Sequence, residues 1–365
     1  MRVFELPAGL TSRAQGQSQG ETFRPLIAEL ADIRLQRLLT LPRAANREEV
    51  ESRARPHLKL LRHYDLELSE EFIGVAEGAN LSPEALLILN HYTDFRDLFD
   101  EPLHPQRAAK DSAGDEGCSI VFARGHDEVF LGQTWDMHGS ALPYVMMLKV
   151  PEREGRPASW LLSLVGCLGM AGLNQAGLAL TINNLRSTDA REGVVWPALV
   201  RRVLKARDFA EAKGVLLDAP VGSGHHYFLA SAAEAFGLET SGRQKEVVFE
   251  GESAHFVHTN HALNEKIARY TQLAPDATST FRYDFLSDQL GRLPSLQNEQ
   301  DLWKLLGSHE NYPRSVCTHL SPSEGAHASL TCGALVMGLS SRKLQAVGGC
   351  AHQARPLHFA FTDEG

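Results

Sequence analysis

The sequence lacks the features that would place the protein in a membrane, on nucleic acid or outside the cell. No window approaches the roughly 18 to 20 consecutive apolar residues that a membrane-spanning helix needs. Lys and Arg total 36 against 45 Asp and Glu, a net charge of -9, so no basic surface for a polyanion is indicated. Residues 1–7 have neither the basic start nor the apolar core of a signal peptide. We therefore expect a cytoplasmic protein with no membrane or nucleic-acid partner.

Cysteine is also scarce. The five cysteines are scattered along the chain without the paired spacing of a metal site: Cys118, Cys167, Cys317, Cys332 and Cys350. In a chain without an export signal this favours reduced thiols, most of them buried in the core. The series His255, His258 and His261 invites a zinc interpretation, but on a strand His258 would point away from the other two. We expect neither a metal ion nor an organic cofactor.

The first third of the chain is predicted to be helical. Apolar residues recur at helical spacing over 24–41, a second helical stretch covers 47–66, and Ser82-Pro83 is a typical helix start. Residues 1–22 are rich in Gly, Ser and Gln toward their end, so we expect them to be irregular apart from a short strand at 2–6. The polar segment 100–117 is predicted to be a surface loop.

Strands and helices alternate in the remaining two thirds. Short apolar runs favour strands, helical spacing favours helices at 196–206, at 209–217 and over most of 263–310, and residues 330–347 are typical of a final β-hairpin. The order of helices, sheet, helices and sheet predicts an α+β protein built of packed layers.

The stretch with the clearest chemical content is Gly-Cys-Ser-Ile at residues 117–120, followed by Gly-Gln-Thr-Trp-Asp at residues 132–136. Both stretches are rich in β-branched and aromatic residues, and the Gly and Asp between them favour a tight turn. The result is a predicted hairpin with Cys118 opening its first strand and Asp136 ending its second. The competing interpretation of Cys118 is a thiol buried in a strand.

A glycine before a strand-opening cysteine suits a protein that cuts its own chain. Gly117 tolerates the backbone angles of a strained peptide bond, and cleavage after it would free the α-amine of Cys118. A thiol with an ordinary pKa of about 8.5 is only slightly ionised at neutral pH. An α-amine titrates at about 7.7 to 8.0, so it could act as the base for the thiol on its own residue.

The two motifs together resemble the acyl-coenzyme A:6-aminopenicillanic acid acyltransferase (isopenicillin N acyltransferase) family of the N-terminal nucleophile (Ntn) hydrolase superfamily. The resemblance runs from about residue 70 to the last strand. It implies a four-layer αββα sandwich with a helical N-terminal pro-segment. Self-cleavage between Gly117 and Cys118 would leave residues 1–117 as a small subunit and 118–365 as a large one, which we expect to stay associated.

The resemblance also assigns roles to single residues. It implies that Asp136 lies beside the nucleophile and orients the new amine, and that the amide of Asn260 lines an oxyanion hole. The competing interpretations are an aspartate that caps a turn and an ordinary loop asparagine. Thr134, Met137 and His138 are candidate substrate-binding residues. A Cys118–His138 dyad is a weaker alternative for catalysis.

The match is weakest at an arginine that the family often carries late in the chain. Thr318 stands at that position, and Arg314 lies four residues earlier, where it is a candidate replacement. The departure argues against a substrate with the carboxylate of a penicillin nucleus. His225 and His226 follow a glycine-rich segment and are predicted to lie in a plain turn rather than at the pocket edge.

The sequence therefore predicts an autoproteolytic enzyme that carries an acyl group on Cys118 and passes it to water or to an amine. Its partners would be a small-molecule amide or acyl donor, for which acyl-coenzyme A is a candidate, an amine acceptor and the protein's own cleaved N-terminal fragment. A second copy of the chain is a further candidate partner. One alternative is a hydrolase of acylated amines, such as β-alanyl-amines or dipeptide-like amides, with no transferase activity. An alternative of another class is a non-catalytic binding protein on an Ntn scaffold.

Overall fold

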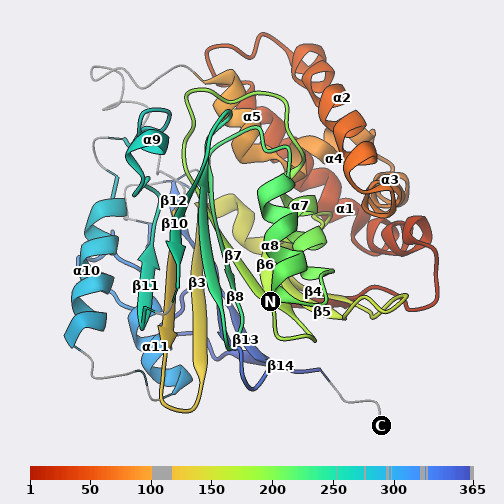
Figure 1. The fold of residues 1–365 in the computed structure, drawn as a ribbon. Coiled ribbons are helices and arrows are strands. Elements are labelled where there is room, and N and C mark those ends of the chain that lie inside the picture. The colour runs from red at the N-terminus through yellow and green to blue at the C-terminus, as the bar shows by residue number, and fades with distance from the viewer. Residues whose placement is uncertain are drawn as a thin grey trace.

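The computed structural model describes residues 1–100, 117–251, 253–274, 277–292, 296, 298–320, 325 and 328–361 (Figure 1). Residues 101–116, nearly all of the predicted surface loop, lie outside these ranges. Gly117, Cys118 and Asp136 are described. Both residues of the predicted cleavage site therefore lie inside the described ranges.

The predicted helical region is confirmed. The described residues before Gly117 form five helices, α1 (Ser12–Leu38), α2 (Arg47–Tyr64), α3 (Leu66–Ala79), α4 (Pro83–Asn90) and α5 (Tyr92–Phe99), and Ser82 caps α4 as expected. The strand expected at the N-terminus is β1 (Arg2–Glu5). The prediction that the rest of residues 1–22 is irregular was wrong, because α1 begins at Ser12 with Thr11 as its cap.

The glycines that made this segment look irregular are the residues that pack it. Gly16 and Gly20 of α1 face Gly74 and Gly78 of α3, one helical turn apart on each helix. A Cβ at any of the four would overlap the backbone of the other helix. The missing side chains let the two helices touch through their backbones. A helix of low intrinsic propensity is thus stabilised by tertiary contact.

Replacing Gly74 with alanine should destabilise the protein by at least about 1–3 kcal/mol, because the new methyl group overlaps the carbonyl oxygen of Arg13. Gly214 in the middle of α8 (Phe209–Asp218) is the matched control, since no atom lies within 4 Å of a Cβ built there. Gly214→Ala should be stabilising by about 0.5–1 kcal/mol. Denaturant unfolding of both variants measures the difference. Equal effects of the two substitutions would contradict the close packing of α1 and α3.

Two sheets form the centre of the molecule. The eight-stranded sheet has the order β1-β4-β5-β6-β7-β8-β9-β10, where the strands after β1 are β4 (Val145–Val150), β5 (Ser159–Leu164), β6 (Ala171–Asn174), β7 (Ala179–Asn184), β8 (His225–Ala230), β9 (Ala235–Thr240) and β10 (Lys245–Glu250). The six-stranded sheet has the order β11-β2-β3-β12-β13-β14, with β11 (His255–His258), β2 (Cys118–Arg124), β3 (Val129–His138), β12 (Ser329–Gly338), β13 (Lys343–Gly348) and β14 (Leu357–Phe359). A 3-10 helix, Gly139–Tyr144, joins β3 to β4. The predicted hairpins β2–β3 and β12–β13 are confirmed.

Helices cover the outer face of each sheet, which makes four layers (Figure 1). α10 (Ser279–Arg292) and α11 (Glu299–Leu306) pack on the six-stranded sheet through Leu286 and Leu302. α7 (Trp196–Leu204) and α8 pack on the eight-stranded sheet. The predicted four-layer αββα fold is confirmed. The helical stretch predicted over most of 263–310 is divided into α9 (Glu265–Ala268), α10 and α11.

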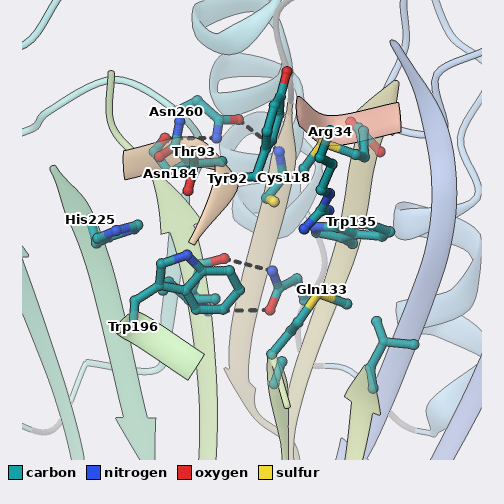
Figure 2. Close-up of a pocket in the computed structure, with 16 residues that line it drawn as sticks. Arg34, Tyr92, Thr93, Cys118, Gln133, Trp135, Asn184, Trp196, His225 and Asn260 are labelled. Atoms are coloured by element: carbon teal, nitrogen blue, oxygen red, sulfur yellow. Dashed lines mark hydrogen bonds between the residues drawn. The ribbon is translucent and has the colours of Figure 1, made fainter. Parts of the chain in front are cut away.

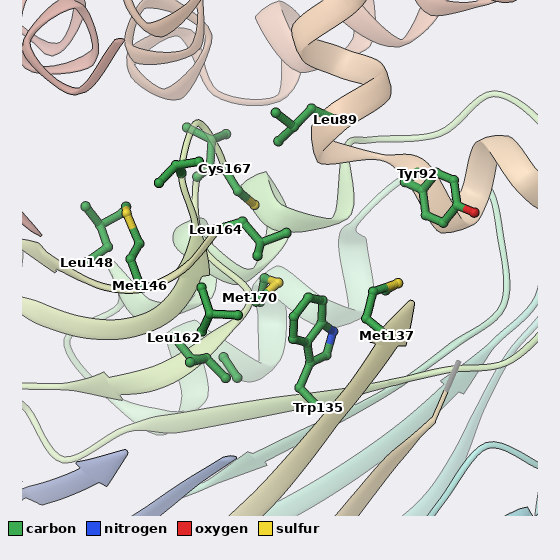
Figure 3. Packing of buried hydrophobic residues seen from close by; sticks show 14 of the residues in the cluster. Leu89, Tyr92, Trp135, Met137, Met146, Leu148, Leu162, Leu164, Cys167 and Met170 are labelled. Carbon is green, nitrogen blue, oxygen red and sulfur yellow. The ribbon is translucent and has the colours of Figure 1, made fainter. Parts of the chain in front are cut away.

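The N-terminal helices share one continuous hydrophobic core with the two sheets. Figure 3 shows its centre, where Leu89 from the helices lies above Leu164 and Trp135 from the sheets and Met170 from the segment between β5 and β6. A buried, bidentate ion pair also joins the N-terminal helices to the rest of the chain. The two terminal nitrogens of Arg201 on α7 each lie 2.8 Å from a carboxylate oxygen of Glu71 on α3. The region before Gly117 is therefore firmly bound to the region after it.

None of the helices in the described ranges is both long and apolar enough to span a membrane by itself. α3 and α4 would reach that length and composition only as a pair, and the pair is bent by 110°. Many of their side chains lie in the shared core.

Candidate active site

The hairpin of β2 and β3 sets Gly117 and Cys118 beside Trp135 and Asp136. Cys118 is the first residue of β2 and pairs with Trp135. Gly117 extends the pairing by one residue, because its N–H donates to the Asp136 carbonyl oxygen at 3.2 Å and its carbonyl oxygen accepts from the Asp136 N–H at 2.6 Å. The peptide bond between Gly117 and Cys118 therefore has a hydrogen-bond donor on its carbonyl oxygen and a carboxylate next to it.

The backbone of Cys118 is held on both sides. Its N–H donates to Asn260 Oδ1 at 2.7 Å. Its carbonyl oxygen accepts from Asn183 Nδ2 at 3.0 Å and from Arg282 Nη1 at 2.8 Å. The side chain is 6% exposed, and its sulfur points into a pocket between the sheets (Figure 2). Both the thiol and the nitrogen of the same residue thus have defined positions.

Asn260 follows β11 and binds Cys118 with its oxygen. Its Nδ2 donates to the carbonyl oxygen of Asn184 at 2.9 Å, and its backbone N–H donates to Ser279 Oγ at 2.8 Å. In this arrangement Asn260 positions the nitrogen of Cys118. Its role in an oxyanion hole stays a prediction.

Arg282 is a site residue that the sequence analysis did not identify. It lies on α10, is 2% exposed, and its guanidinium donates to the Cys118 carbonyl oxygen, to Ser119 Oγ at 2.8 Å and to Asn260 Oδ1 at 2.9 Å. A signal was present, because residues 282, 286 and 290 share one helical face and the other two are buried leucines. An arginine on the apolar face of a helix needs buried partners, and here they are Cys118, Ser119 and Asn260.

Arg314, the arginine considered from the sequence, lies elsewhere. Its Nη1 donates to the carbonyl oxygen of Ser329 at 3.4 Å, and it is not among the residues that line the pocket. Thr318 connects to the site through two hydrogen bonds. Its N–H donates to Thr331 Oγ1 at 2.9 Å, and that hydroxyl donates to Asp136 Oδ1 at 2.7 Å.

Burial governs the acid–base properties of the site. Burial and, second to it, the negative charge of Asp136 together raise the pKa of the Cys118 thiol to about 12, against the lowering effect of Arg282. Burial also raises the pKa of Asp136 to about 6, against the lowering effects of Arg282 and the Thr331 hydrogen bond. At neutral pH the thiol is protonated and Asp136 is mostly ionised. The thiol therefore needs a base close at hand before it can attack a carbonyl carbon.

The pocket around Cys118 brings together all three residues predicted to be catalytic. Its cavity volume is about 40 Å³, and Cys118, Asp136 and Asn260 line it. Arg34, Tyr92 and Thr93 reach it from the N-terminal helices, so both parts of the chain build the site. The other lining residues are Gln133, Trp135, Met137, Leu162, Met170, Ala171, Ile182, Asn184, Trp196 and His225.

One side of the pocket is apolar and another is polar. Figure 3 shows Trp135, Met137, Leu162 and Met170 clustered together on the apolar side. On the other side lie Asn184, Trp196 and His225 (Figure 2). Within the described residues, Asn184 Oδ1, Trp196 Nε1 and His225 Nδ1 are buried with no hydrogen-bond partner. Such atoms are costly unless a ligand or water satisfies them.

The candidate substrate-binding residues divide between the pocket and its support. Met137 lines the pocket. Thr134 Oγ1 accepts from the Ser119 N–H at 3.1 Å and so supports β2, while His138 Nδ1 lies 2.7 Å from Ser140 Oγ. Neither of them is a lining residue. The prediction that His225 and His226 lie in a turn was wrong, since both belong to β8 and His225 lines the pocket.

Comparison with known proteins connects this geometry to a family. The profile of the acyl-coenzyme A:6-aminopenicillanic acid acyl-transferase family matches residues 123–347, which include Asp136 and Asn260 and begin just after Cys118. The 40 kDa form of acyl-coenzyme A:6-aminopenicillanic-acid-acyltransferase from Emericella nidulans is 25% identical over 250 residues, which are 68% of this chain and 66% of the relative, just under two thirds of its length.

Two solved structures also align with the chain. Penicillin V acylase from Agrobacterium tumefaciens is 13% identical with a TM-score of 0.42, covering 66% of this chain and 84% of that one. A variant of conjugated bile acid hydrolase from Clostridium perfringens is 11% identical with a TM-score of 0.46, covering 67% and 97%. The assignment rests on the family profile, which matches more than half of the chain. This protein belongs to the acyl-coenzyme A:6-aminopenicillanic acid acyl-transferase family.

Proposed function

We propose that this protein is a self-processing cysteine amidohydrolase or acyltransferase whose nucleophile is the thiol of Cys118 and whose base is the α-amine of the same residue. The observation that carries the proposal is the pairing of a protonated, buried thiol with a backbone nitrogen that is already bound to Asn260 Oδ1. Cleavage would turn that nitrogen into an amine beside the sulfur. Nucleophile and base would then be fixed by covalent geometry.

Self-cleavage would begin with attack of Cys118 Sγ on the Gly117 carbonyl carbon. The C–N bond breaks, the thiol proton passes to the departing nitrogen, and a thioester joins Gly117 to Sγ. Water then hydrolyses the thioester and frees the thiol and the carboxylate of Gly117. The Asp136 N–H on the Gly117 carbonyl oxygen would stabilise the negative charge that develops there. A side chain at 117 would obstruct this arrangement, since a Cβ would lie 2.8 Å from Asp136 Oδ2 and 3.1 Å from Arg282 Nη2.

Turnover would use the same atoms on a substrate. The α-amine of Cys118 takes the thiol proton, the sulfur attacks the acyl carbon, and the substrate's amine leaves with a proton. The resulting thioester passes its acyl group to water or to a second amine. This chemistry requires no metal ion or organic cofactor, and acyl-coenzyme A could serve as an acyl donor instead of an amide.

The pocket favours an acylated amine with a compact, apolar acyl group. A cavity of about 40 Å³ has room for only a few water-sized groups. We assign the acyl group to the side formed by Met137, Leu162 and Met170. The amide or amine would lie against Asn184, Trp196 and His225, where its polar atoms could satisfy the unpartnered ones.

Trapping the acyl-enzyme tests this function. Processed protein is mixed with short-chain N-acyl amines or acyl-coenzyme A, quenched in acid, and the large fragment is weighed by mass spectrometry. We expect one added acyl group on Cys118, and a competing amine in the mixture shows whether transfer accompanies hydrolysis. Absence of an adduct and of product across such a panel would favour a binding protein instead.

The pKa of Asp136 should appear in the pH dependence of self-cleavage. If the carboxylate is the required form, the cleavage rate of freshly refolded precursor rises with pH through about 6 and then levels. Thr331→Val removes a hydrogen bond that lowers this pKa, so the midpoint of the rise in cleavage rate should move to a higher pH. Thr331→Ser keeps a hydroxyl at this position and should restore the original pH profile. A rate independent of pH between 5 and 8 in all three proteins would rule out this role of Asp136.

The raised pKa of Asp136 also affects folding stability, which we expect to fall with rising pH, whereas the cleavage rate rises. The pKa of Asp136 in the folded chain is about 6, above its ordinary 3.8, so the folded state holds the proton more tightly than the unfolded state does. Burial of Asp136 therefore costs stability progressively as the pH rises from about 3.8 to about 6. The carboxylate is retained at this cost, as expected of a functional group.

A further inference from the structure

Four side chains outside the Cys118 pocket converge on one point. His309 follows α11, Cys317 and His319 lie in the same loop, and Cys350 lies just after β13. One ligand atom from each lies within 4.8 Å of all the others. The sulfur atoms of Cys317 and Cys350 are 3.7 Å apart, and the Nε2 atoms of His309 and His319 are 3.0 Å apart.

We propose that His309, Cys317, His319 and Cys350 form a structural zinc site. A tetrahedral zinc ion lies at about 2.3 Å from sulfur and about 2.0–2.1 Å from nitrogen, so neighbouring ligand atoms are about 3.3–3.8 Å apart. The separations between sulfur and nitrogen, 3.7 Å for Cys317–His319 and 3.5 Å for Cys350–His309, fall in this range, as does the 3.7 Å between the two sulfur atoms. The 3.0 Å between the two Nε2 atoms is shorter than the range, so the imidazoles would move slightly apart when the ion binds. Two thiolates and two imidazoles are also the ligand set that favours zinc over magnesium or calcium.

The backbone around the cluster holds the ligands in place. The N–H of Cys317 donates to the Ser308 carbonyl oxygen at 3.1 Å, and the N–H of His319 donates to that of Pro313 at 2.9 Å. On the opposite side, the carbonyl oxygen of Cys350 accepts from the Ala354 N–H at 3.1 Å. Only Cys317 is fully buried, so an ion could enter from the surface.

The position of the site indicates a structural role for the ion, which would link two segments of the chain. The ion would tie the loop after α11 to the end of β13, and among the described residues no strand pairing joins these two segments. Thr318 lies between two of the ligands, and its N–H binds the Thr331 hydroxyl that donates to Asp136. The ion would therefore support the loop that orients Asp136, as a positioning element outside the reaction itself.

Metal analysis tests the site independently of catalysis. The full chain is produced with zinc in the medium, purified without a metal-affinity tag, and assayed by mass spectrometry for bound metals. We expect about one zinc per chain, and cobalt-loaded protein should show the absorption bands of a tetrahedral, thiolate-bound ion. Removal of the metal by a chelator should lower the Tm by about 5 °C or more, and added zinc should restore it.

Matched variants separate this site from general loss of thiols or histidines. Cys317→Ser and His319→Ala should each lose most of the zinc. Cys350→Ser should do the same, and it replaces either of them in the test if that variant folds poorly. His352→Ala is the control, because its ring lies 4.7 Å from that of His309 but it is not one of the four ligands. Cys167→Ala is a second control at a buried thiol elsewhere. Metal-free protein with the wild-type Tm, or a Cys317–Cys350 disulfide in protein made with zinc, would overturn the proposal.

Discussion

Cys118→Ala should leave the chain uncut and lower activity toward acylated amines by at least about 10⁴-fold, the range seen when a covalent nucleophile is removed. The reason is that the variant lacks both the atom that attacks Gly117 and the atom that carries the acyl group. Denaturing electrophoresis with intact mass measures the first effect, and product formation measures the second. The fold should persist, because Cys118 contributes one small side chain to a large core.

The matched control is Cys167→Ala, another buried cysteine in the same core cluster. It should be cut and active like the wild type apart from a modest loss of stability. If Cys118→Ala were cut at the same bond as the wild type, the thiol would not be the group that cleaves the chain. If an uncut Cys118→Ala protein kept its activity, another residue would be the nucleophile.

Arg282→Ala should lower kcat by about 10² to 10³-fold, comparable to losing an electrostatic donor at a reacting centre. Its guanidinium binds the carbonyl oxygen of Cys118 and the same Asn260 oxygen that accepts from the Cys118 nitrogen. Without it, these buried acceptors lose a charged donor, and Asp136 loses the positive charge that opposes the rise in its pKa. Arg282→Lys keeps the charge but not the forked geometry, so we expect only partial recovery.

Arg201→Lys is the comparison that separates positioning from folding. Arg201 is 3% exposed and paired with Glu71, so its replacement should cost stability while the activity per folded molecule stays close to that of the wild type. For Arg282→Ala the loss should appear in kcat and in a shifted pH profile at temperatures where the protein is folded. An effect of Arg282→Ala on Tm alone would show that the arginine is structural.

The sequence predicted the features that are local in the chain. The β2–β3 hairpin follows from strand-forming residues on either side of a short turn, and Cys118, Asp136 and Asn260 were named from motifs that the structure brings to one pocket. The layered α+β class followed from the alternation of helical and strand segments, and the four-layer αββα order followed from the family resemblance. These features depend on residues close together or on a family pattern.

Features that depend on long-range contact were missed for physical reasons. Gly16 and Gly74 lower helix propensity in isolation and stabilise α1 only once the two helices meet. Arg282 reaches Cys118 across 164 residues of sequence. His309 and Cys350 lie in segments with no recognisable spacing, so the expectation of no metal ion did not take their convergence into account. The spacing of residues carries no direct information about contacts that the tertiary fold creates.

The most direct test of the central claim is the N-terminal sequence of the large fragment in active protein. The account predicts that this fragment begins at Cys118, that its α-amine reacts with amine-selective reagents, and that blocking this amine abolishes activity while the fold is kept. Fully active protein with an intact bond between Gly117 and Cys118 would contradict the account.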